Sequence, residues 1–180
     1  EGASIVLKRP AEYLHVDDVY GELRSMVKVV PNLSVRVRPE TAIVPLSGDR
    51  KKEFTVTLHN QSPEGGVAKV GLEVPEGWTV EPEFRTVEFG RPGETISLQF
   101  EVNVSRSSGE FEVSATARML NENYRRGYRV IDYPHIKTRH IYADARSRVK
   151  VFEIDTRAAN IGYVQGAGDN VAGALAQLGM

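Results

Sequence analysis

The 180-residue sequence contains no cysteine, a single tryptophan and no long apolar run. Without cysteine the chain has no disulfides and no thiolate nucleophile or ligand. A bilayer crossing needs about 20 consecutive apolar residues, so we expect no membrane span. An excess of charge of one sign is also lacking, because 23 basic residues stand against 24 acidic ones and the net charge is −1. This balance disfavours nucleic acid and anionic membranes as partners.

The sequence does contain an internal repeat. Segment 19–29, VYGELRSMVKV, aligns with segment 141–151, IYADARSRVKV, and six of the eleven aligned pairs are identical. Tyr142 therefore lies 122 positions after Tyr20, a spacing close to the length of one β-sandwich domain. We interpret each copy as the exit strand of a module. Residues 1–31 are then the tail of a preceding β module, and we expect the natural chain to begin upstream of Glu1.

Between the two copies, apolar residues recur at every second position, which is the period of a strand with one buried face. The alternation is clearest in five runs: 33–37, 54–58, 68–74, 96–104 and 111–119. Clusters of glycine, proline and serine separate these runs, and such clusters form turns. About seven short antiparallel strands spaced in this way predict an all-β, immunoglobulin-like β-sandwich over residues 32–156.

The composition changes after this region. Residues 161–164 predict a buried strand, 166–168 a tight glycine turn, and 171–178 a helix capped by Asp169 or Asn170. A strand, a turn and a capped helix together form the beginning of a βα unit. We therefore expect residues 157–180 to be a short terminal βα segment, the truncated start of a following α/β domain.

Patterns typical of catalysis or metal binding are missing from the sequence. His135 and His140 are five positions apart, which fits neither a ligand pair at i, i+4 on a helix nor one at i, i+2 on a strand. No G-x-S-x-G elbow is present. The glycine turn lacks the third glycine of the dinucleotide fingerprint, because position 171 is valine. We expect no catalytic residue, no metal site and no cofactor in this chain.

One cluster suggests binding, because it combines aromatic and basic side chains. Stacked rings with cationic neighbours are suited to a saccharide or to a partner surface. The candidate carbohydrate-binding residues are Trp78, Tyr124, Arg126, Tyr128, Tyr133, His135 and Tyr142. The alternative is a final strand whose arginines protect a sheet edge. The alternative for Trp78 is a place in the core, because tryptophan is highly buried on average.

Three stretches resemble the NEW3 domain, an immunoglobulin-like module also called the NPCBM-associated domain of α-galactosidases. They are LSVRVRPE (33–40), KKEFTVTLHNQSPEGGVAKVGLEVPEGWTVEPE (51–83) and ETISLQFEVNV (94–104). VIDYPHI (130–136) and IGYVQGAGDNVAGALAQLG (161–179) resemble the C-terminal portion of large bacterial PIG-L (LmbE-like) deacetylases. In those proteins a zinc-dependent N-acetylglucosamine deacetylase domain comes first, sandwich modules follow, and a glutamine-amidotransferase-like domain comes last.

The resemblance implies a noncatalytic accessory module that spaces or stabilises flanking domains of the same polypeptide, in a PIG-L-family hydrolase. Zinc is then expected only in the deacetylase domain, which this chain lacks, so no catalytic residue carries over. The alternative is a carbohydrate-binding module that uses the aromatic-basic surface, and a weaker one is a wall of the deacetylase active site. We expect an extracytoplasmic location in a bacterium, periplasmic or secreted, although the absence of cysteine leaves the compartment open.

Overall fold

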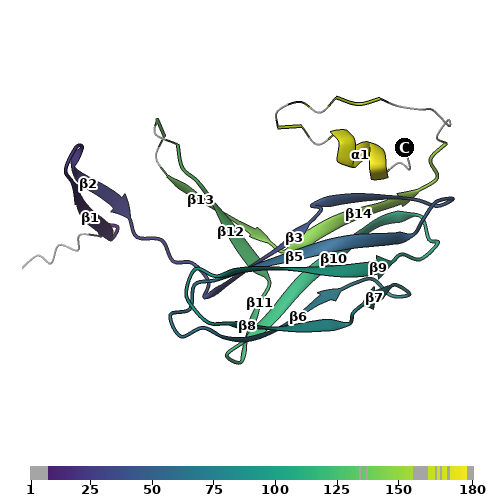
Figure 1. Ribbon diagram of the computed structural model, residues 1–180, viewed down its shortest axis with the longest axis horizontal. Coiled ribbons are helices and arrows are strands. Elements are labelled where there is room, and N and C mark those ends of the chain that lie inside the picture. Colours follow the sequence, from purple (N-terminus) through teal and green to yellow (C-terminus); the bar gives the residue numbers. More distant parts are fainter. Residues whose placement is uncertain are drawn as a thin grey trace, which may run out of the picture. The chain divides into compact units, whose positions relative to one another are not determined.

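The computed structural model describes residues 8–133, 135–136, 138–155, 162–164, 166, 168–169 and 171–177. The chain divides into two compact units, Glu1–Val30 and Pro31–Met180. The boundary between them lies one residue before the end of the predicted N-terminal tail. The second unit contains two stacked sheets and is an all-β, immunoglobulin-like sandwich (Figure 1).

The first sheet of the sandwich has four strands in the order β3-β5-β9-β7. Their bounds are Leu33–Arg38 (β3), Lys51–Asn60 (β5), Thr95–Asn103 (β9) and Thr79–Glu81 (β7). Every neighbouring pair in this sheet is antiparallel. Strand β3 therefore stands at one edge of the sheet.

The second sheet follows the order β4-β14-β10-β6-β8, and a short strand, β11, also pairs with β10. The bounds are Thr41–Pro45 (β4), Arg146–Phe152 (β14), Gly109–Met119 (β10), Gly66–Glu73 (β6), Phe84–Phe89 (β8) and Glu122–Tyr124 (β11). Strand β4 runs parallel to β14, and the other pairs are antiparallel. The sequence did not predict this parallel pair, because β4 follows β3 directly but joins the opposite sheet.

Alternating side chains from both sheets form one core. In β5 the even positions Phe54, Val56 and Leu58 are fully buried, and the predicted alternation is confirmed. Phe54 lies directly opposite Phe100 on β9, so two large rings from neighbouring strands enter the same layer. A fully buried side chain of this size contributes about 1.5–3 kcal/mol. A one-residue shift of register would turn each of these rings toward water.

A two-stranded ribbon extends from the sandwich (Figure 1). It consists of β12 (Arg126–Ile131) and β13 (Arg139–Asp144) in antiparallel pairing. Strand β12 follows β11 after one residue, and β13 precedes β14 by one residue. The ribbon is therefore an outward continuation of strands that belong to the second sheet. The sequence predicted a strand here, but it placed that strand last in the sandwich.

In the first unit, the described residues 8–30 form one hairpin, with strands β1 (Glu12–Asp17) and β2 (Gly21–Met26). The Asp17 carboxylate closes its turn, because Oδ1 accepts hydrogen bonds from the Val19 and Tyr20 amides at 2.8 and 2.9 Å. Nearly all side chains of both strands are exposed. A hairpin of this size buries too little apolar surface to be stable by itself.

The C-terminal segment differs in part from the prediction. Helix α1 (Val171–Gln177) is present, and the Val171 amide donates to Asp169 Oδ1 at 3.4 Å, so the predicted cap by Asp169 is confirmed. The predicted buried strand at 161–164 is wrong for Gly162, Tyr163 and Val164, which are exposed and form no strand. No strand among the described residues pairs with them. Asn170 and Leu178 lie outside the described residues. No described helix has the length and apolarity that a membrane crossing requires.

Candidate functional site

The base of the ribbon is fixed to the sandwich by backbone hydrogen bonds around Ala145. The Ala145 amide donates to the Arg125 carbonyl at 2.7 Å, and the Ala115 amide of β10 donates to the Ala145 carbonyl at 2.7 Å. Ala145 itself is buried. The ribbon therefore leaves the second sheet at a defined point rather than through a loose linker.

Gly127 allows the ribbon to lie directly against the edge strand β3. A Cβ atom at Gly127 would stand 2.5 Å from the Val35 carbonyl oxygen and 2.7 Å from Arg36 Cγ, distances that a side chain cannot occupy. At the same contact the Tyr128 amide donates to Ser34 Oγ at 3.3 Å. The ribbon thus covers the edge of β3 at Ser34 and Val35.

Aromatic side chains line one face of the ribbon. Tyr128 and Tyr142 are direct cross-strand partners, with ring centroids 6.1 Å apart, and Tyr128 stacks on His140 at 5.7 Å. Gln61 Nε2 donates to the Tyr128 hydroxyl at 2.6 Å, which orients that ring. Burial, with a smaller contribution from Tyr142, raises the pKa of Tyr128 above its ordinary value. We call Tyr128, His140 and Tyr142 the ring stack.

A groove of about 630 Å³ lies beside the ribbon, and we call it the arginine groove. Its walls come from β3 and the start of β4, from the ribbon, and from β10 and β14. The lining residues are Arg36, Val37, Arg38, Glu40, Thr41, Glu112, Arg126, Gly127, Tyr128, Arg129, Ile141, Tyr142, Ala143, Asp144, Arg146 and Arg148. Six of them are arginines and three are carboxylates, so the groove is locally positive in a chain whose net charge is −1.

Two of the arginines are held by carboxylates of the groove. Arg126 Nε lies 2.9 Å from Asp144 Oδ1, and Arg146 pairs with both Asp144 and Glu112. These carboxylates raise the pKa of Arg146, with Glu112 making the largest contribution. All four side chains are substantially exposed, so these pairs contribute little to stability. Their effect is to order one end of the groove.

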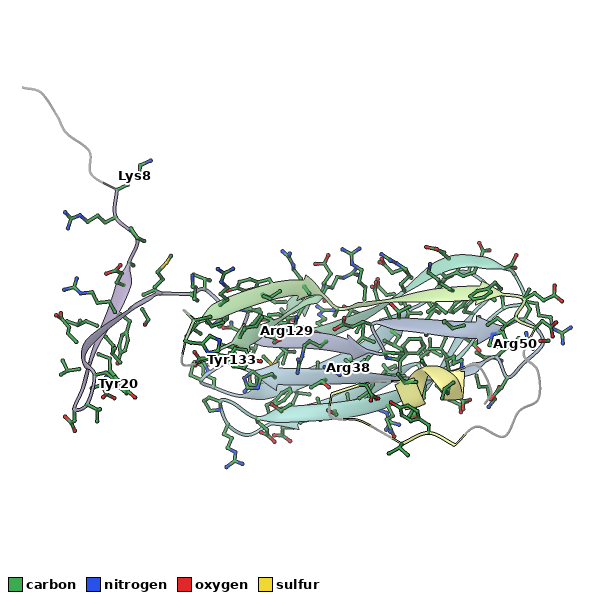
Figure 2. The ribbon with its side chains drawn as sticks, turned by 90° about the horizontal axis from the view of Figure 1, so that it is seen from above. Lys8, Tyr20, Arg38, Arg50, Arg129 and Tyr133 are labelled. Carbon is green, nitrogen blue, oxygen red and sulfur yellow. The ribbon has the colours of Figure 1, made fainter. Side chains whose placement is uncertain are left out.

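Four other arginines of the groove, Arg148 among them, carry no ion pair in the part of the chain that the structure describes. Arg36 and Arg38 lie on β3 with their side chains exposed, on the face opposite to the buried Val35 and Val37. Arg129 is exposed on β12, across the groove. Figure 2 shows Arg38 and Arg129 among the side chains that cover this part of the second unit. These guanidinium groups are available to a ligand.

Two of the predicted binding residues belong to the core instead. The core position predicted for Trp78 is confirmed, since it is 6% exposed, packs on Phe111 with ring centroids 5.1 Å apart, and donates from Nε1 to Ser105 Oγ at 3.1 Å. Tyr124 is 8% exposed and donates its hydroxyl hydrogen to Glu122. The prediction that these two rings offer a surface to a saccharide is wrong, because burial leaves no ring face open.

The remaining predicted residues separate into two groups. Arg126, Tyr128 and Tyr142 all line the arginine groove. Tyr133 and His135 lie in the connection between β12 and β13, exposed and stacked on each other at 5.9 Å, and they do not line the groove (Figure 2). The structure therefore brings together three of the seven candidate residues in the groove.

The sequence reasoning missed Arg36 and Arg38. The sequence feature that could have identified them is the segment Val35-Arg36-Val37-Arg38, in which arginines occupy the outward positions of an otherwise apolar strand. Two arginines at such positions on an edge strand also serve to prevent edge-to-edge association. Their proximity to the ribbon, 90 residues further along the chain, is a tertiary contact that the strand pattern does not carry.

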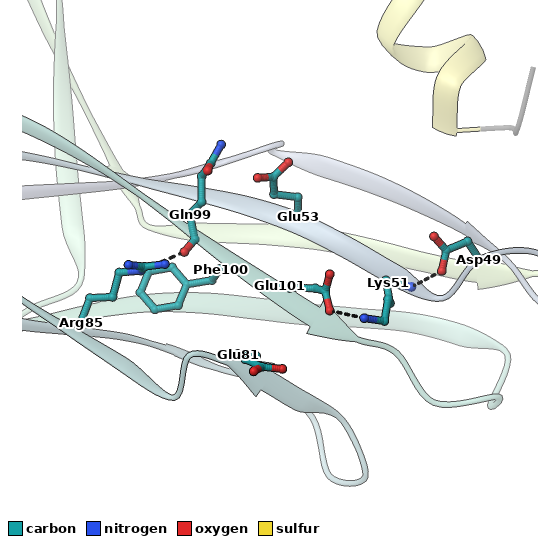
Figure 3. Close-up of a pocket in the computed structure, with 8 residues that line it drawn as sticks. All are labelled: Asp49, Lys51, Glu53, Glu81, Arg85, Gln99, Phe100 and Glu101. Atoms are coloured by element: carbon teal, nitrogen blue, oxygen red, sulfur yellow. Dashed lines mark hydrogen bonds and ion pairs between the residues drawn. The ribbon is translucent and has the colours of Figure 1, made fainter.

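A second depression lies on the outer face of the first sheet and has the opposite charge (Figure 3). Glu53, Glu101 and Glu81 stand directly opposite one another on β5, β9 and β7. Lys51 Nζ lies 2.6 Å from Glu101 Oε1 and offsets part of the repulsion between the three carboxylates. The hydrogen bond to Glu101 raises the pKa of Lys51. Among the described residues, no group of three or more histidine, aspartate or glutamate side chains has the arrangement of a metal site.

Comparisons with known proteins concern the fold. No family model matches the chain, and no curated protein matches it. The sandwich is similar to part of Salmonella α2-macroglobulin reacted with methylamine, with a TM-score of 0.47 and 16% identity over 73% of this chain. The aligned region is 8% of that protein. It is also similar to a FixG-related protein from Vibrio parahaemolyticus, with a TM-score of 0.40 and 12% identity, covering 68% of this chain and 98% of the other.

Proposed function

We propose that this chain is a noncatalytic β-sandwich accessory module that spaces or stabilises flanking domains of a multidomain PIG-L-family N-acetylglucosamine deacetylase-like hydrolase. The family part of the proposal rests on the sequence resemblance to NEW3 domains and to the C-terminal portion of bacterial PIG-L deacetylases. The modular part rests on one structural observation, the different burial of the two repeated segments.

Residues 146–151 of the second copy lie on β14 inside the sandwich, whereas residues 141–144 belong to the ribbon strand β13. The valines of the first copy are not buried. Val149 and Val151 on β14 are 0% and 2% exposed, between β10 and β4. The corresponding Val27 and Val29 are 56% and 88% exposed. An apolar strand with this sequence is stable when neighbouring strands and an opposite sheet cover it. This contrast supports a role for residues 19–29 as the exit strand of a preceding sandwich module.

Because the chain contains no cysteine, single introduced cysteines test the modular proposal directly. Single variants Val27→Cys and Val149→Cys are compared by the rate of maleimide labelling, in this chain and in a natural chain extended upstream. In this chain we expect rapid labelling at residue 27 and slow labelling at residue 149. In the extended chain residue 27 is expected to become at least about tenfold slower, because a partner module buries it. Equal rates at residue 27 in the two chains would contradict the modular proposal.

The parent activity needs a separate measurement. The full-length natural protein is expected to release acetate from N-acetylglucosamine oligosaccharides in a zinc-dependent manner, and this chain alone is expected to release none. Acetate release by this chain alone would overturn the noncatalytic role. Absence of activity in the zinc-loaded full-length protein would overturn the assignment to a deacetylase.

The ring stack favours a second candidate function, a carbohydrate-binding module that uses the aromatic-basic surface. Tyr142 is 42% exposed and lies beside a groove of suitable volume for a small ligand. Glycan-array binding by Tyr142→Ala and Tyr133→Ala distinguishes the groove from the outer connection. Tyr20→Ala is the matched control, because Tyr20 is the repeat counterpart of Tyr142 and lies in the first unit. Binding that survives both substitutions unchanged would exclude this surface as the site.

A further inference from the structure

We propose that the arginine groove binds an acidic saccharide, one that carries carboxylate or sulfate groups. This proposal rests on the second candidate function and adds the charge of the ligand. It assigns the recognition of the acidic groups to Arg36, Arg38 and Arg129, and the contact with the sugar rings to Tyr142. Arg129 belongs to the aromatic-basic cluster that the sequence identified, whereas Arg36 and Arg38 were not among the candidate binding residues.

The first argument is electrostatic. Arg126 and Arg146 already have carboxylate partners within the groove, whereas Arg36, Arg38 and Arg129 have none among the described residues. A planar guanidinium group donates two parallel hydrogen bonds to a carboxylate or sulfate, and such charge-assisted pairs are stronger than neutral ones. A concave surface with an excess of one charge also concentrates ligands of the opposite charge. The groove therefore selects for an anion.

The second argument is the arrangement of the three groups. Arg36 and Arg38 are alternate residues on β3, so their Cα atoms are spaced by roughly 7 Å along one face of the strand. Arg129 comes from β12 on the other side of the groove. A ligand with acidic groups repeated along its length can contact both walls. A single small anion would occupy one guanidinium group at a time.

The third argument is the aromatic surface at the same place. Tyr142 and Tyr128 line the groove, and the orientation of Tyr128 is fixed by Gln61 and His140. A tyrosine ring offers an apolar face and a polar hydroxyl group, a combination suited to a sugar ring, which is itself amphipathic. The groove thus combines ring faces with polar groups, as ligand sites do.

Two other polyanions fit the structure less well. Nucleic-acid-binding domains are strongly basic, whereas this chain has a net charge of −1 and a pI of about 6.5. An acidic peptide could add a strand to the edge of β3, but β12 covers that edge at Ser34 and Val35. The saccharide is therefore the ligand class that the observations favour.

Isothermal titration of the whole chain tests the proposal with four defined probes: a sulfated heparin octasaccharide, a trigalacturonate, neutral chitohexaose and sodium sulfate. We expect the first two to bind and the last two not to. Arg36→Ala, Arg38→Ala and Arg129→Ala are each expected to weaken binding roughly five- to tenfold, because each removes a charge-assisted contact. Arg118→Ala is the matched control, since Arg118 is an exposed arginine on β10 that does not line the groove. It should leave the affinity unchanged.

The outcomes distinguish the two proposals. If chitohexaose binds as tightly as the acidic sugars, and Tyr142→Ala but no arginine variant weakens it, the carbohydrate-binding function survives and the acidic ligand is wrong. If no saccharide binds, both are overturned, and the accessory-module proposal is unaffected. An equal loss in Arg118→Ala, or sodium sulfate binding with the same affinity, would reduce the effect to nonspecific charge and overturn the proposal. Oligo(dT) is titrated as a fifth probe, and tighter binding of oligo(dT) than of the octasaccharide would assign the groove to nucleic acid instead.

Discussion

The two copies of the repeated segment share six of eleven residues, and the valines at their C-terminal ends have opposite environments. In β14 the valines of the second copy enter the core, with β10 hydrogen-bonded on one side and β4 on the other. In the first copy the corresponding valines are exposed, and β2 pairs with β1 alone. The difference shows that the pattern of an exit strand specifies which face is apolar. Burial of that face depends on the strands and the sheet that meet it.

Introducing a charged residue should produce the largest difference in stability between substitutions in the two copies. Val149→Asp places a carboxylate in the fully buried layer between the sheets, where none of the described buried residues is basic, and we expect a loss of more than about 4 kcal/mol in the free energy of unfolding. Val27→Asp should change it by less than about 0.5 kcal/mol. Urea unfolding followed by fluorescence measures this in the second unit, because Trp78 is the only tryptophan. Similar losses in both variants would show that the first copy is also part of a core.

A smaller change tests the same contrast quantitatively. Val151→Ala removes two buried methyl groups and leaves a cavity, for which we expect a loss of about 2–3 kcal/mol. Val29→Ala removes the same groups from an exposed position and should cost less than about 0.5 kcal/mol. The midpoints of urea unfolding provide the comparison. An unchanged midpoint for Val151→Ala would mean that β14 is not required for the stability of the sandwich.

Much of the sandwich could be predicted from the sequence, because its signals are local. The alternation in 54–58 and 96–104 fixes which side chains face the core, and the glycine and proline clusters fix where strands end. The parallel pair of β4 and β14 could not be predicted in this way. Its partners are about 100 residues apart, and the choice of sheet for β4 depends on contacts that no local pattern encodes.

The candidate site was predictable only in part, for the same reason. Composition identified the aromatic and basic residues of the ribbon, including Tyr128 and Tyr142. The predicted set also included Trp78, because tryptophan occurs both in sugar-binding surfaces and in buried cores, and composition does not distinguish the two. Arg38 was missed because its role arises from the ribbon packed beside β3, and that packing depends on Gly127.

The two hairpins provide the next comparison. Gly127→Ala forces a Cβ atom against the Val35 carbonyl, and we expect a loss of about 1–2 kcal/mol, since the ribbon can tilt away from β3 to relieve part of the overlap. Gly21→Ala strains a left-handed backbone, φ 73°, but the added methyl meets no neighbouring atom within 4 Å. It should leave the unfolding of the second unit unchanged. A stable, unaltered second unit in Gly127→Ala would show that the ribbon is not held against β3 in solution.

The smallest expected effect concerns the lysine that both copies share. Lys150 Nζ lies 2.8 Å from Glu110 Oε1 and lowers the pKa of that exposed carboxyl, so the pair stabilises the fold above the ordinary pKa of glutamate. This contribution is lost as the pH falls and Glu110 becomes protonated. Lys150→Met should therefore lower the thermal midpoint slightly at pH 7 and not at pH 3, whereas Lys28→Met should have no effect at either pH. A difference between wild type and Lys150→Met that stays constant from pH 7 to pH 3 would instead assign the role of Lys150 to packing of its alkyl chain, because packing does not titrate.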